Sequence, residues 1–208
     1  MKKIKNKIKN VLLLLARKLK SVEIQEKQNI QKRHAVFSIG KHTYGSENIV
    51  IDRYKGSDNK ITIGSYCSIA TNVTIITGGI HPVNWVSAYP FRAKFRLEGR
   101  FNDGIPYSKG EVIIGNDVWI CSYVTILSGI TVGNGAVLAS NSVITKDVPA
   151  YALVGGNPAR IIKMRFTESQ IKILERIKWW EWKEQKVITV IPYLNSENID
   201  EFIEKYSV

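Results

Sequence analysis

The sequence of 208 residues is poor in cysteine, in histidine and in long apolar runs, and each shortage excludes a class of protein. Its two cysteines, Cys67 and Cys121, lie far apart. They therefore form neither a four-ligand zinc site nor the disulfide framework of a small secreted protein. No stretch approaches the roughly 18 consecutive apolar residues of a membrane-spanning helix. We expect a cytoplasmic protein with one domain and short appendages.

Acidic residues are also scarce, but only at the start of the chain. Thirty Lys and Arg against 18 Asp and Glu give a net charge of +12, and residues 1–20 hold eight of these cations and no acid. The rest of the chain keeps 22 cations (30 − 8) against 18 acids, a net charge of +4. No basic groove rich in aromatic residues is evident, so we expect no nucleic-acid partner.

Residues 4–19 place apolar side chains three and four positions apart, with lysines on the opposite face. This pattern predicts a basic amphipathic helix. Its apolar centre, residues 11–16, is shorter than a signal-peptide core and no cleavage site follows, so we expect the segment to be retained. Two interpretations stay open: the helix binds an anionic membrane at its inner face, or it packs on the protein or a sister subunit.

From residue 61 onward, aliphatic residues recur at every sixth position. They are Ile63, Ile69 and Ile75, and later Ile114, Ile120, Ile126, Val132, Leu138 and Ile144. An α-helix cannot use this period, because it turns about 100° per residue and would scatter these side chains around its axis. A coil with three short strands per turn can, with each aliphatic pointing inward and stacked on the one three repeats away. The sequence therefore predicts a mainly β protein with parallel strands.

The six-residue frame is lost between Ile75 and Ile114, where residues 79–111 leave the coil as a long loop. Loops of such length in compact domains are usually functional or disordered. Six aromatic residues in this loop argue against disorder, so we expect it to pack on a surface. They are Trp85, Tyr89, Phe91, Phe95, Phe101 and Tyr107.

The end of the chain predicts helices. Thr167, with Gln170 at the capping-box position, marks a helix start, and a last helix is expected near residues 199–206. We expect the tryptophans of "KWWEW" (178–182) to pack in a core, and residues 54–60 to form a corner insertion in the coil. The predicted division is an N-terminal helix and linker (1–34), a β-helix domain (35–164) that contains the 79–111 loop, and a C-terminal helical segment (165–208).

Six motifs, in this order, resemble one family. They are "HTYG" (42–45), "IGSYCSIA" (63–70), "GGIHPVNWVSAYPF" (78–91), "IGNDVWI" (114–120), "VITKDVPAYALVGGNPAR" (143–160) and "IKWWEW" (177–182). They are similar to the hexapeptide-repeat acetyltransferases, in the xenobiotic acetyltransferase branch, which includes chloramphenicol, streptogramin and surface-polysaccharide enzymes. The resemblance covers about residues 35–190. It implies a left-handed β-helix, a homotrimer with active sites between subunits, and acetyl-coenzyme A as donor.

Within this resemblance, His81 holds the position of the catalytic histidine. Acetyl transfer to an alcohol requires that the hydroxyl proton be removed as the oxygen attacks the thioester carbonyl. A neutral imidazole suits this step at neutral pH, and a positioned base contributes about 10²–10⁴ in rate. One ring nitrogen can face the substrate while a backbone carbonyl holds the other. His34 and His42 lack this context. A zinc enzyme of the hexapeptide type, with three converging histidines, is the metal-dependent alternative, and we expect no metal.

The resemblance also implies a donor site. Trp119 would lie beside the pantetheine arm, and Ser122 and Ser140 would offer it backbone groups. Facing the nucleotide end, where cations suit the phosphates, would be Thr145, Lys146, Arg160 and Lys163. We expect acceptor contacts from Tyr44, Trp85 and Tyr89. The chain departs from the family at Cys121, where glycine is usual, and at "ASNS" (139–142), and both departures add bulk near the expected pantetheine path.

The sequence therefore predicts an O-acetyltransferase that transfers acetyl directly, because no activated serine or cysteine signature is present. The basic N-terminal segment favours a sugar of a surface polysaccharide, or its lipid-linked precursor, as the acceptor. An antibiotic such as chloramphenicol or a streptogramin is the alternative, which would make the protein a resistance enzyme. A non-catalytic scaffold or binding module is the alternative from another class.

Overall fold

The computed structural model describes residues 37–54 and 59–207. Internal contacts divide the chain into two units, residues 1–38 and 39–208, and only Phe37 and Ser38 of the first are described. The predicted basic helix and His34 lie outside the described residues. Within the described part of the chain, no helix has the length and apolar character needed to cross a bilayer.

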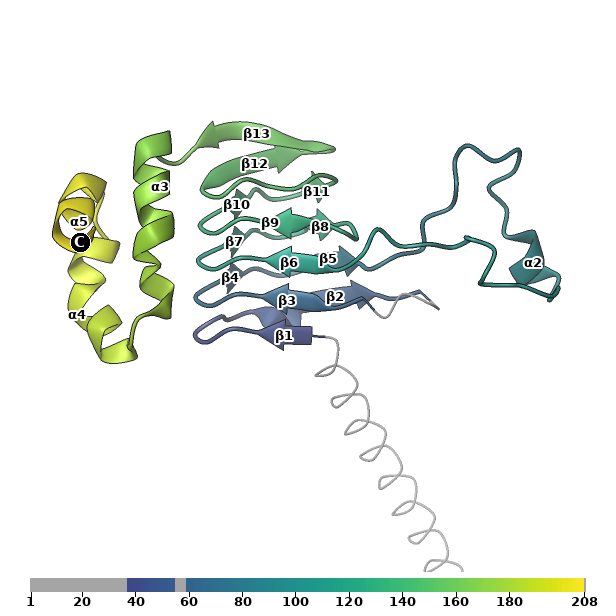
Figure 1. Cartoon of the computed structure of the whole chain (residues 1–208), viewed down its shortest axis with the longest axis horizontal. Coiled ribbons are helices and arrows are strands. Elements are labelled where there is room, and N and C mark those ends of the chain that lie inside the picture. Colours follow the sequence, from purple (N-terminus) through teal and green to yellow (C-terminus); the bar gives the residue numbers. More distant parts are fainter. Residues whose placement is uncertain (1–36, 55–58, 208) are drawn as a thin grey trace, which may run out of the picture. The chain divides into compact units, whose positions relative to one another are not determined.

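Short strands form three sheets, which the chain visits in turn (Figure 1). Sheet 1 has the order β1 (Phe37–Ile39), β3 (Ile61–Ile63), β6 (Val112–Ile114) and β9 (Thr131–Val132). Sheet 2 consists of β4 (Ser68–Ile69), β7 (Trp119–Ile120), β10 (Val137–Leu138), β12 (Ala152–Gly156) and β13 (Ala159–Met164). Sheet 3 consists of β2 (Ile49–Asp52), β5 (Val73–Ile76), β8 (Thr125–Ile126) and β11 (Val143–Ile144).

The pairs among strands β2 to β12 are parallel, whereas β12 and β13 are antiparallel. The predicted coil of parallel strands is thus confirmed. Its interior is the stack of period-six aliphatics. Ile120 pairs with Ile69 on one side and Leu138 on the other, and none of the three is more than 3% exposed. Burying one such side chain contributes about 1.5–3 kcal/mol, so the repeat itself supplies the core.

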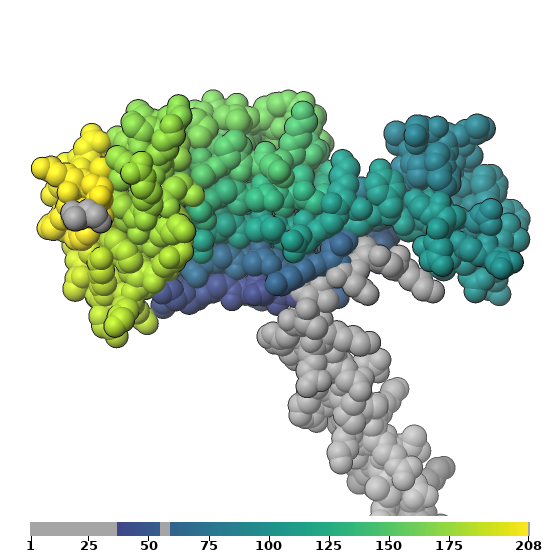
Figure 2. Space-filling view, viewed as in Figure 1, coloured from purple at the N-terminus to yellow at the C-terminus, as the bar shows by residue number. Residues whose placement is uncertain are grey.

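Helices follow the coil and cover one of its flanks (Figure 2). They are α3 (Glu168–Ile177), the 3₁₀ turn η2 (Trp179–Glu181), α4 (Glu184–Leu194) and α5 (Ile199–Tyr206). The predicted capping box is confirmed, because the Thr167 side chain accepts from the Gln170 N–H and the Gln170 side chain bonds back to Thr167 N–H. The packing role of the tryptophans is also confirmed, since Trp179 and Trp180 are buried beside Leu174. Helix α4 was not predicted.

Stacked asparagines tie α3 to the corner between sheets 1 and 2. Asn116 Oδ1 accepts the Ser65 N–H at 2.8 Å, and Asn134 Oδ1 accepts the Asn116 N–H at 2.8 Å. Asn134 Nδ2 then donates to both carboxylate oxygens of Glu175, at 3.0 and 3.2 Å. Each asparagine thereby satisfies backbone groups that the corner would otherwise leave unpaired.

The long loop leaves the coil after β5 and returns at β6, so it departs from the corner between sheets 3 and 1 (Figure 1). We call residues 79–111 the arm. The arm contains the short helix α2 (Phe91–Lys94). The remaining element, the 3₁₀ turn η1 (Ser46–Asn48), lies outside the arm and precedes β2. Phe91 and Phe95 are 52% and 64% exposed, so described residues of the same chain leave these rings largely uncovered.

Candidate active site

At the root of the arm, the departing and returning segments run side by side through one isolated bridge, which we call the ribbon. Ile80 and Tyr107 form an antiparallel bridge in which each N–H donates to the other's carbonyl, at 3.0 and 2.9 Å. His81 follows directly. The sequence interrupts the coil here, and the ribbon brings the two ends of the arm together at that point. His81 therefore lies at the base of the arm, next to the coil, rather than at the tip.

The His81 ring is held by the arm itself. Its Nδ1 lies 2.6 Å from the carbonyl oxygen of Ala88. A carbonyl only accepts hydrogen bonds, so in the neutral ring Nδ1 carries the hydrogen and Nε2 has a free lone pair. The side chain is half-buried. The contact defines the tautomer of the neutral ring and leaves Nε2 as the nitrogen that can accept a proton.

The outer face of sheet 2 carries a continuous column of side chains. It begins at Tyr44, which bridges to Ser68, and continues through the register of neighbouring strands. Its members are Tyr44, Ser68, Trp119, Val137, Leu153 and Lys163. Trp119 is 54% exposed although it sits between buried neighbours in sequence, Val118 and Ile120. The column borders a groove of about 350 Å³, which we call the sheet-2 groove.

Three of the predicted site residues therefore share one surface: Tyr44, Trp119 and Lys163. The sequence analysis missed Ser68, Val137 and Leu153, which lie between them. One signal could have found these three, because each directly precedes the inward aliphatic of its strand and so must point outward. An apolar face of this kind suits the pantetheine chain of a thioester donor.

The other predicted donor residues are spread over two corners of the coil and strand β13. Ser122 and Ser140 occupy the corner between sheets 2 and 3, where Asn141 N–H donates to Ser122 O at 3.1 Å. Thr145 and Lys146 follow β11 at the corner between sheets 3 and 1, with Thr145 half-buried and Lys146 exposed, so one chain does not bring them to the sheet-2 groove. Arg160 is exposed on β13, in the strand that also carries Lys163.

Cys121 lies at the corner beside Ser140. Burial raises the pKa of its thiol, and hydrogen bonds from Ser140 only partly oppose this. Burial also raises the pKa of the Cys67 thiol, which is enclosed in the coil. A thiol with a raised pKa is a poor nucleophile, so neither cysteine is suited to carry an acyl group.

The remaining predicted residues divide between the arm and the coil. Trp85 and Tyr89 are both about half exposed on the arm, where the Tyr89 ring packs edge-on against Phe91. His42 stacks on Tyr66, with ring centroids 4.8 Å apart, at the corner covered by the helices. Among residues 37–54 and 59–207, no three side chains of His, Cys, Asp or Glu converge as a metal site would require.

His81 and the sheet-2 groove are not brought together within one chain. The arm leaves the corner between sheets 3 and 1, whereas Trp119 faces outward from sheet 2. In a three-sided coil that corner lies opposite sheet 2. A site that combines His81 with this groove therefore requires a second copy of the chain.

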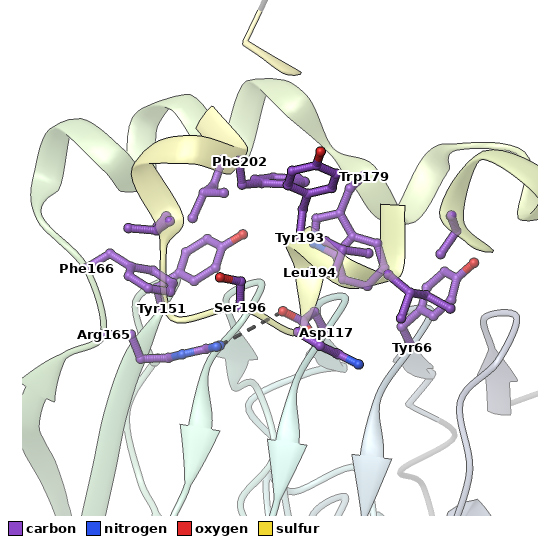
Figure 3. A pocket seen from close by; sticks show the side chains of 15 residues that line it. Tyr66, Asp117, Tyr151, Arg165, Phe166, Trp179, Tyr193, Leu194, Ser196 and Phe202 are labelled. Carbon is purple, nitrogen blue, oxygen red and sulfur yellow. Dashed lines mark ion pairs between the residues drawn. The ribbon is translucent and has the colours of Figure 1, made fainter. Parts of the chain in front are cut away.

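A second cavity, of about 380 Å³, lies between the coil and the C-terminal helices (Figure 3). Tyr66, Asp117, Tyr151 and Arg165 line it from the coil, and Trp179 and Phe202 from the helical segment. None of the predicted site residues reaches it. Asp117 and Arg165 line both this cavity and the sheet-2 groove, with Asp117 Oδ2 3.9 Å from Arg165 Nη1.

Burial raises the pKa of Asp117 to about 6, although Arg165 opposes the shift. An acid whose pKa is higher in the folded state favours folding while it is protonated. Its contribution is fully present below the unfolded-state value of about 4 and is lost as the pH rises through about 6. Asp117 therefore disfavours the fold at neutral and alkaline pH.

We expect Asp117→Asn to stabilise the protein at pH 8 and to change little at pH 4. Asparagine keeps the shape and tolerates the positive φ of 56° at this position. The gain at pH 8 is on the order of 1 kcal/mol, because a carboxylate that is about one-third exposed is partly screened by solvent. Thermal unfolding of the unchanged protein and of Asp117→Asn, at pH 4 and at pH 8, measures this difference in stability. Equal destabilisation at both would contradict the expectation.

Comparison with known proteins places these features in a family. Residues 111–146 match the family described as bacterial transferase hexapeptide (six repeats). The chain is 42% identical over 145 residues to a chloramphenicol acetyltransferase of Klebsiella aerogenes, covering 68% of this chain and 69% of that protein. It is 36% identical over 159 residues to a probable macrolide acetyltransferase of Lysinibacillus sphaericus, covering 74% and 88%.

A solved structure is similar over a comparable length. It is a hexapeptide-repeat acetyltransferase from Vibrio cholerae O1 biovar eltor in complex with acetyl-coenzyme A, with 31% identity, a TM-score of 0.49, and coverage of 64% of this chain and 62% of that one. The family assignment rests on the two sequence relatives alone, because each alignment covers more than two thirds of this chain and more than two thirds of the relative. The chain belongs to the hexapeptide-repeat acetyltransferases, and within them to the xenobiotic acetyltransferase branch.

Proposed function

We propose that the protein transfers acetyl from acetyl-coenzyme A to a hydroxyl group, with His81 as the general base. The observation that carries this proposal is the 2.6 Å contact of His81 Nδ1 with Ala88 O, which leaves Nε2 to accept a proton. Nε2 takes the hydroxyl proton as the acceptor oxygen bonds to the acetyl carbon. When the carbon–sulfur bond breaks, Nε2 returns that proton to the departing sulfur.

Transfer is direct, without an acetylated enzyme. Both thiols have raised pKa values, caused first by burial, and so are largely protonated at neutral pH. A base, a donor and an acceptor then suffice for the reaction. The protein contributes proton transfer and the alignment of the two substrates.

The donor binds along the sheet-2 groove of a left-handed coil. Trp119 and its apolar neighbours Val137 and Leu153 support the pantetheine chain. Lys163 and Arg160 offer cations to the phosphates of the nucleotide. Lys146, with Thr145 beside it, would reach them from the neighbouring copy, because both follow β11 at the corner opposite sheet 2. Ser122 and Ser140 line the edge of this path. Cys121 narrows it, because a side chain stands where a glycine would leave room.

The active unit is a homotrimer with one site between each pair of neighbours. Two observations support this. His81 and the sheet-2 groove face different sides of one chain, and the arm carries exposed aromatic rings, such as Phe91 and Phe95, that a neighbour can cover. The arm of one copy would then bring His81, Trp85 and Tyr89 to the groove and Tyr44 of the next.

We propose as acceptor a sugar hydroxyl of a surface polysaccharide or its lipid-linked precursor. The supporting feature is the basic amphipathic segment at the start of the sequence, which a small soluble acceptor would not need. An antibiotic is the second candidate, because the relatives above are named for chloramphenicol and macrolides. Both candidates present a hydroxyl to the same base.

An acceptor screen with labelled acetyl-coenzyme A tests the choice. We expect label transfer to nucleotide- or lipid-linked sugars, and slower transfer to lipid-linked sugars after deletion of residues 1–20. Chloramphenicol, a streptogramin and a macrolide form the second arm of the screen. Rapid acetylation of an antibiotic that is indifferent to the deletion would overturn the sugar assignment. Calorimetry with acetyl-coenzyme A tests the scaffold alternative, for which no heat of binding is expected.

A further inference from the structure

The hydrogen bond to Ala88 fixes the His81 ring within the arm, but it does not fix the arm to the coil. Ala88 belongs to the arm, so the pair would move together if the arm moved. A base that works on substrates bound to a neighbour must be fixed relative to the coil, because a displacement of about 1 Å can cost on the order of 100-fold in rate. The arm therefore needs an attachment near its root.

The described ends of the corner insertion, Tyr54 and Asn59, provide this attachment. Asn59, at its end, reaches up one turn of the coil. Its Nδ2 donates to Thr77 O at 2.9 Å and to Ser108 Oγ at 2.6 Å. Thr77 lies just before the arm and Ser108 in the segment that returns from it, so one amide group holds the departing and the returning chain together.

Further bonds close this network on itself. Ser108 Oγ donates to Thr77 O at 2.6 Å and accepts the Gly110 N–H at 3.1 Å. Thr77 N–H and Oγ1 both donate to Asp52 O, at 3.0 and 3.1 Å. Thr77 is 1% exposed, so water does not compete for these bonds. The network joins the arm to β2 in the turn of the coil below.

The same insertion makes a second contact, through Tyr54. A Cβ placed on Gly79 would lie 2.6 Å from three atoms of the Tyr54 ring, and Gly79 has a φ of +81°. Only glycine leaves space for the ring at this backbone conformation. Tyr54 thus packs against the backbone two residues before His81, and its hydroxyl donates to Asp52 Oδ2 at 3.2 Å.

We propose that Asn59 is a positioning residue for catalysis, which with Ser108 and Tyr54 sets where His81 stands relative to the coil. This proposal rests on the proposed role of His81 as the base. In this proposal Asn59 contacts neither the acetyl donor nor the acceptor. The Asn59 amide would act on His81 through a short series of contacts. It bonds to Thr77 and Ser108 at the root of the arm, the Ile80–Tyr107 bridge lies next, and His81 directly follows Ile80.

The alternative is that Asn59 only stabilises a corner of the coil. Asn134 offers a matched control, because it is also a partly buried corner asparagine, whose side chain bonds to Asn116 in the neighbouring turn and to Glu175 on α3. It lies at the corner between sheets 1 and 2, away from the arm. A purely stabilising role would make the two residues alike in every kinetic measurement.

The test compares Asn59→Ala with Asn134→Ala in the full-length chain, below the melting temperature of both. We expect Asn59→Ala to lower kcat by about 10-fold or more, with the KM and Kd for acetyl-coenzyme A unchanged. Asn134→Ala should lower the melting temperature and leave kcat unchanged. NMR of ¹⁵N-histidine-labelled protein should show the His81 ring signals shifted or broadened in Asn59→Ala alone.

If Asn59→Ala does not fold, the isosteric Asn59→Asp replaces it, since its carboxylate oxygen faces Thr77 O and Ser108 Oγ instead of donating to them. The variant His81→Ala separates the two proposals. Retained activity in His81→Ala means that the proposed function fails. If His81→Ala is inactive and Asn59→Ala keeps its kcat, the positioning role is overturned. A further loss in the double variant His81→Ala/Asn59→Ala would also overturn it.

Discussion

Replacing His81 with alanine is expected to lower kcat by at least about 100-fold, while the affinity for coenzyme A stays nearly unchanged. In the proposed mechanism the imidazole of His81 is the base, and its Nδ1 is already held by Ala88 O. Water can replace Nε2 only poorly, because it is neither positioned nor sufficiently basic. Initial rates with labelled acetyl-coenzyme A, together with calorimetric titration of coenzyme A, measure both quantities.

His42 provides the control for this substitution. Its ring stacks on Tyr66 at the corner covered by the helices, and its Nε2 lies 3.9 Å from Glu184 Oε2. We expect His42→Ala to lower the melting temperature and to retain turnover. A His81→Ala protein that remained active, or a His42→Ala protein that lost activity at an unchanged melting temperature, would contradict the assignment of the base.

The coil could be predicted from the sequence because its interior has a strict geometry. Each two-residue strand of the coil presents one inward position, and a polar residue there would be buried without a partner. Ile69, Ile120 and Leu138 are aliphatic for this reason, and they stack in the register that the period implies. The helix start at Thr167 was equally predictable, since a capping box is a local signal.

Outward positions of the coil accept polar and apolar residues alike, so the sequence pattern did not reveal all the residues of the site. Ser68, Val137 and Leu153 form one surface with Trp119 only because parallel pairing aligns four strands. Helix α4 escaped prediction because it contains Pro192 and carries no capping box at its start. Its buried residues depend on contacts with other helices, which no local pattern encodes.

The arm shows the same division between local and tertiary information. The loss of the six-residue frame located the arm, and its motif pointed to His81. The partner of the imidazole could not be predicted, because Ala88 contributes a backbone carbonyl that any residue could supply. The role of Asn59 was equally hidden, since its side chain bonds to Ser108 across 49 positions of sequence.

Mixing two inactive variants is expected to restore about a quarter of full activity. His81→Ala removes the base and leaves the sheet-2 groove intact, whereas Trp119→Glu puts a charge into the groove and leaves the arm intact. The arm leaves the coil at the corner opposite sheet 2, so in the proposed trimer each site takes His81 from one copy and Trp119 from the next. In a randomly mixed trimer, half of the arms and half of the grooves are intact. About one site in four then has both.

Co-expression of the two variants, or joint refolding, produces the mixed trimers, and light scattering should give three times the mass of the chain. The control replaces the second partner with His81→Ala/Trp119→Glu, which contributes no intact arm and should restore nothing. Mixed trimers without recovered activity would mean that His81 and Trp119 act within one chain or not in one site at all. A monomer at micromolar concentration would contradict the shared site more directly, because the exposed rings of the arm and the sheet-2 groove would then have no neighbour to complete them.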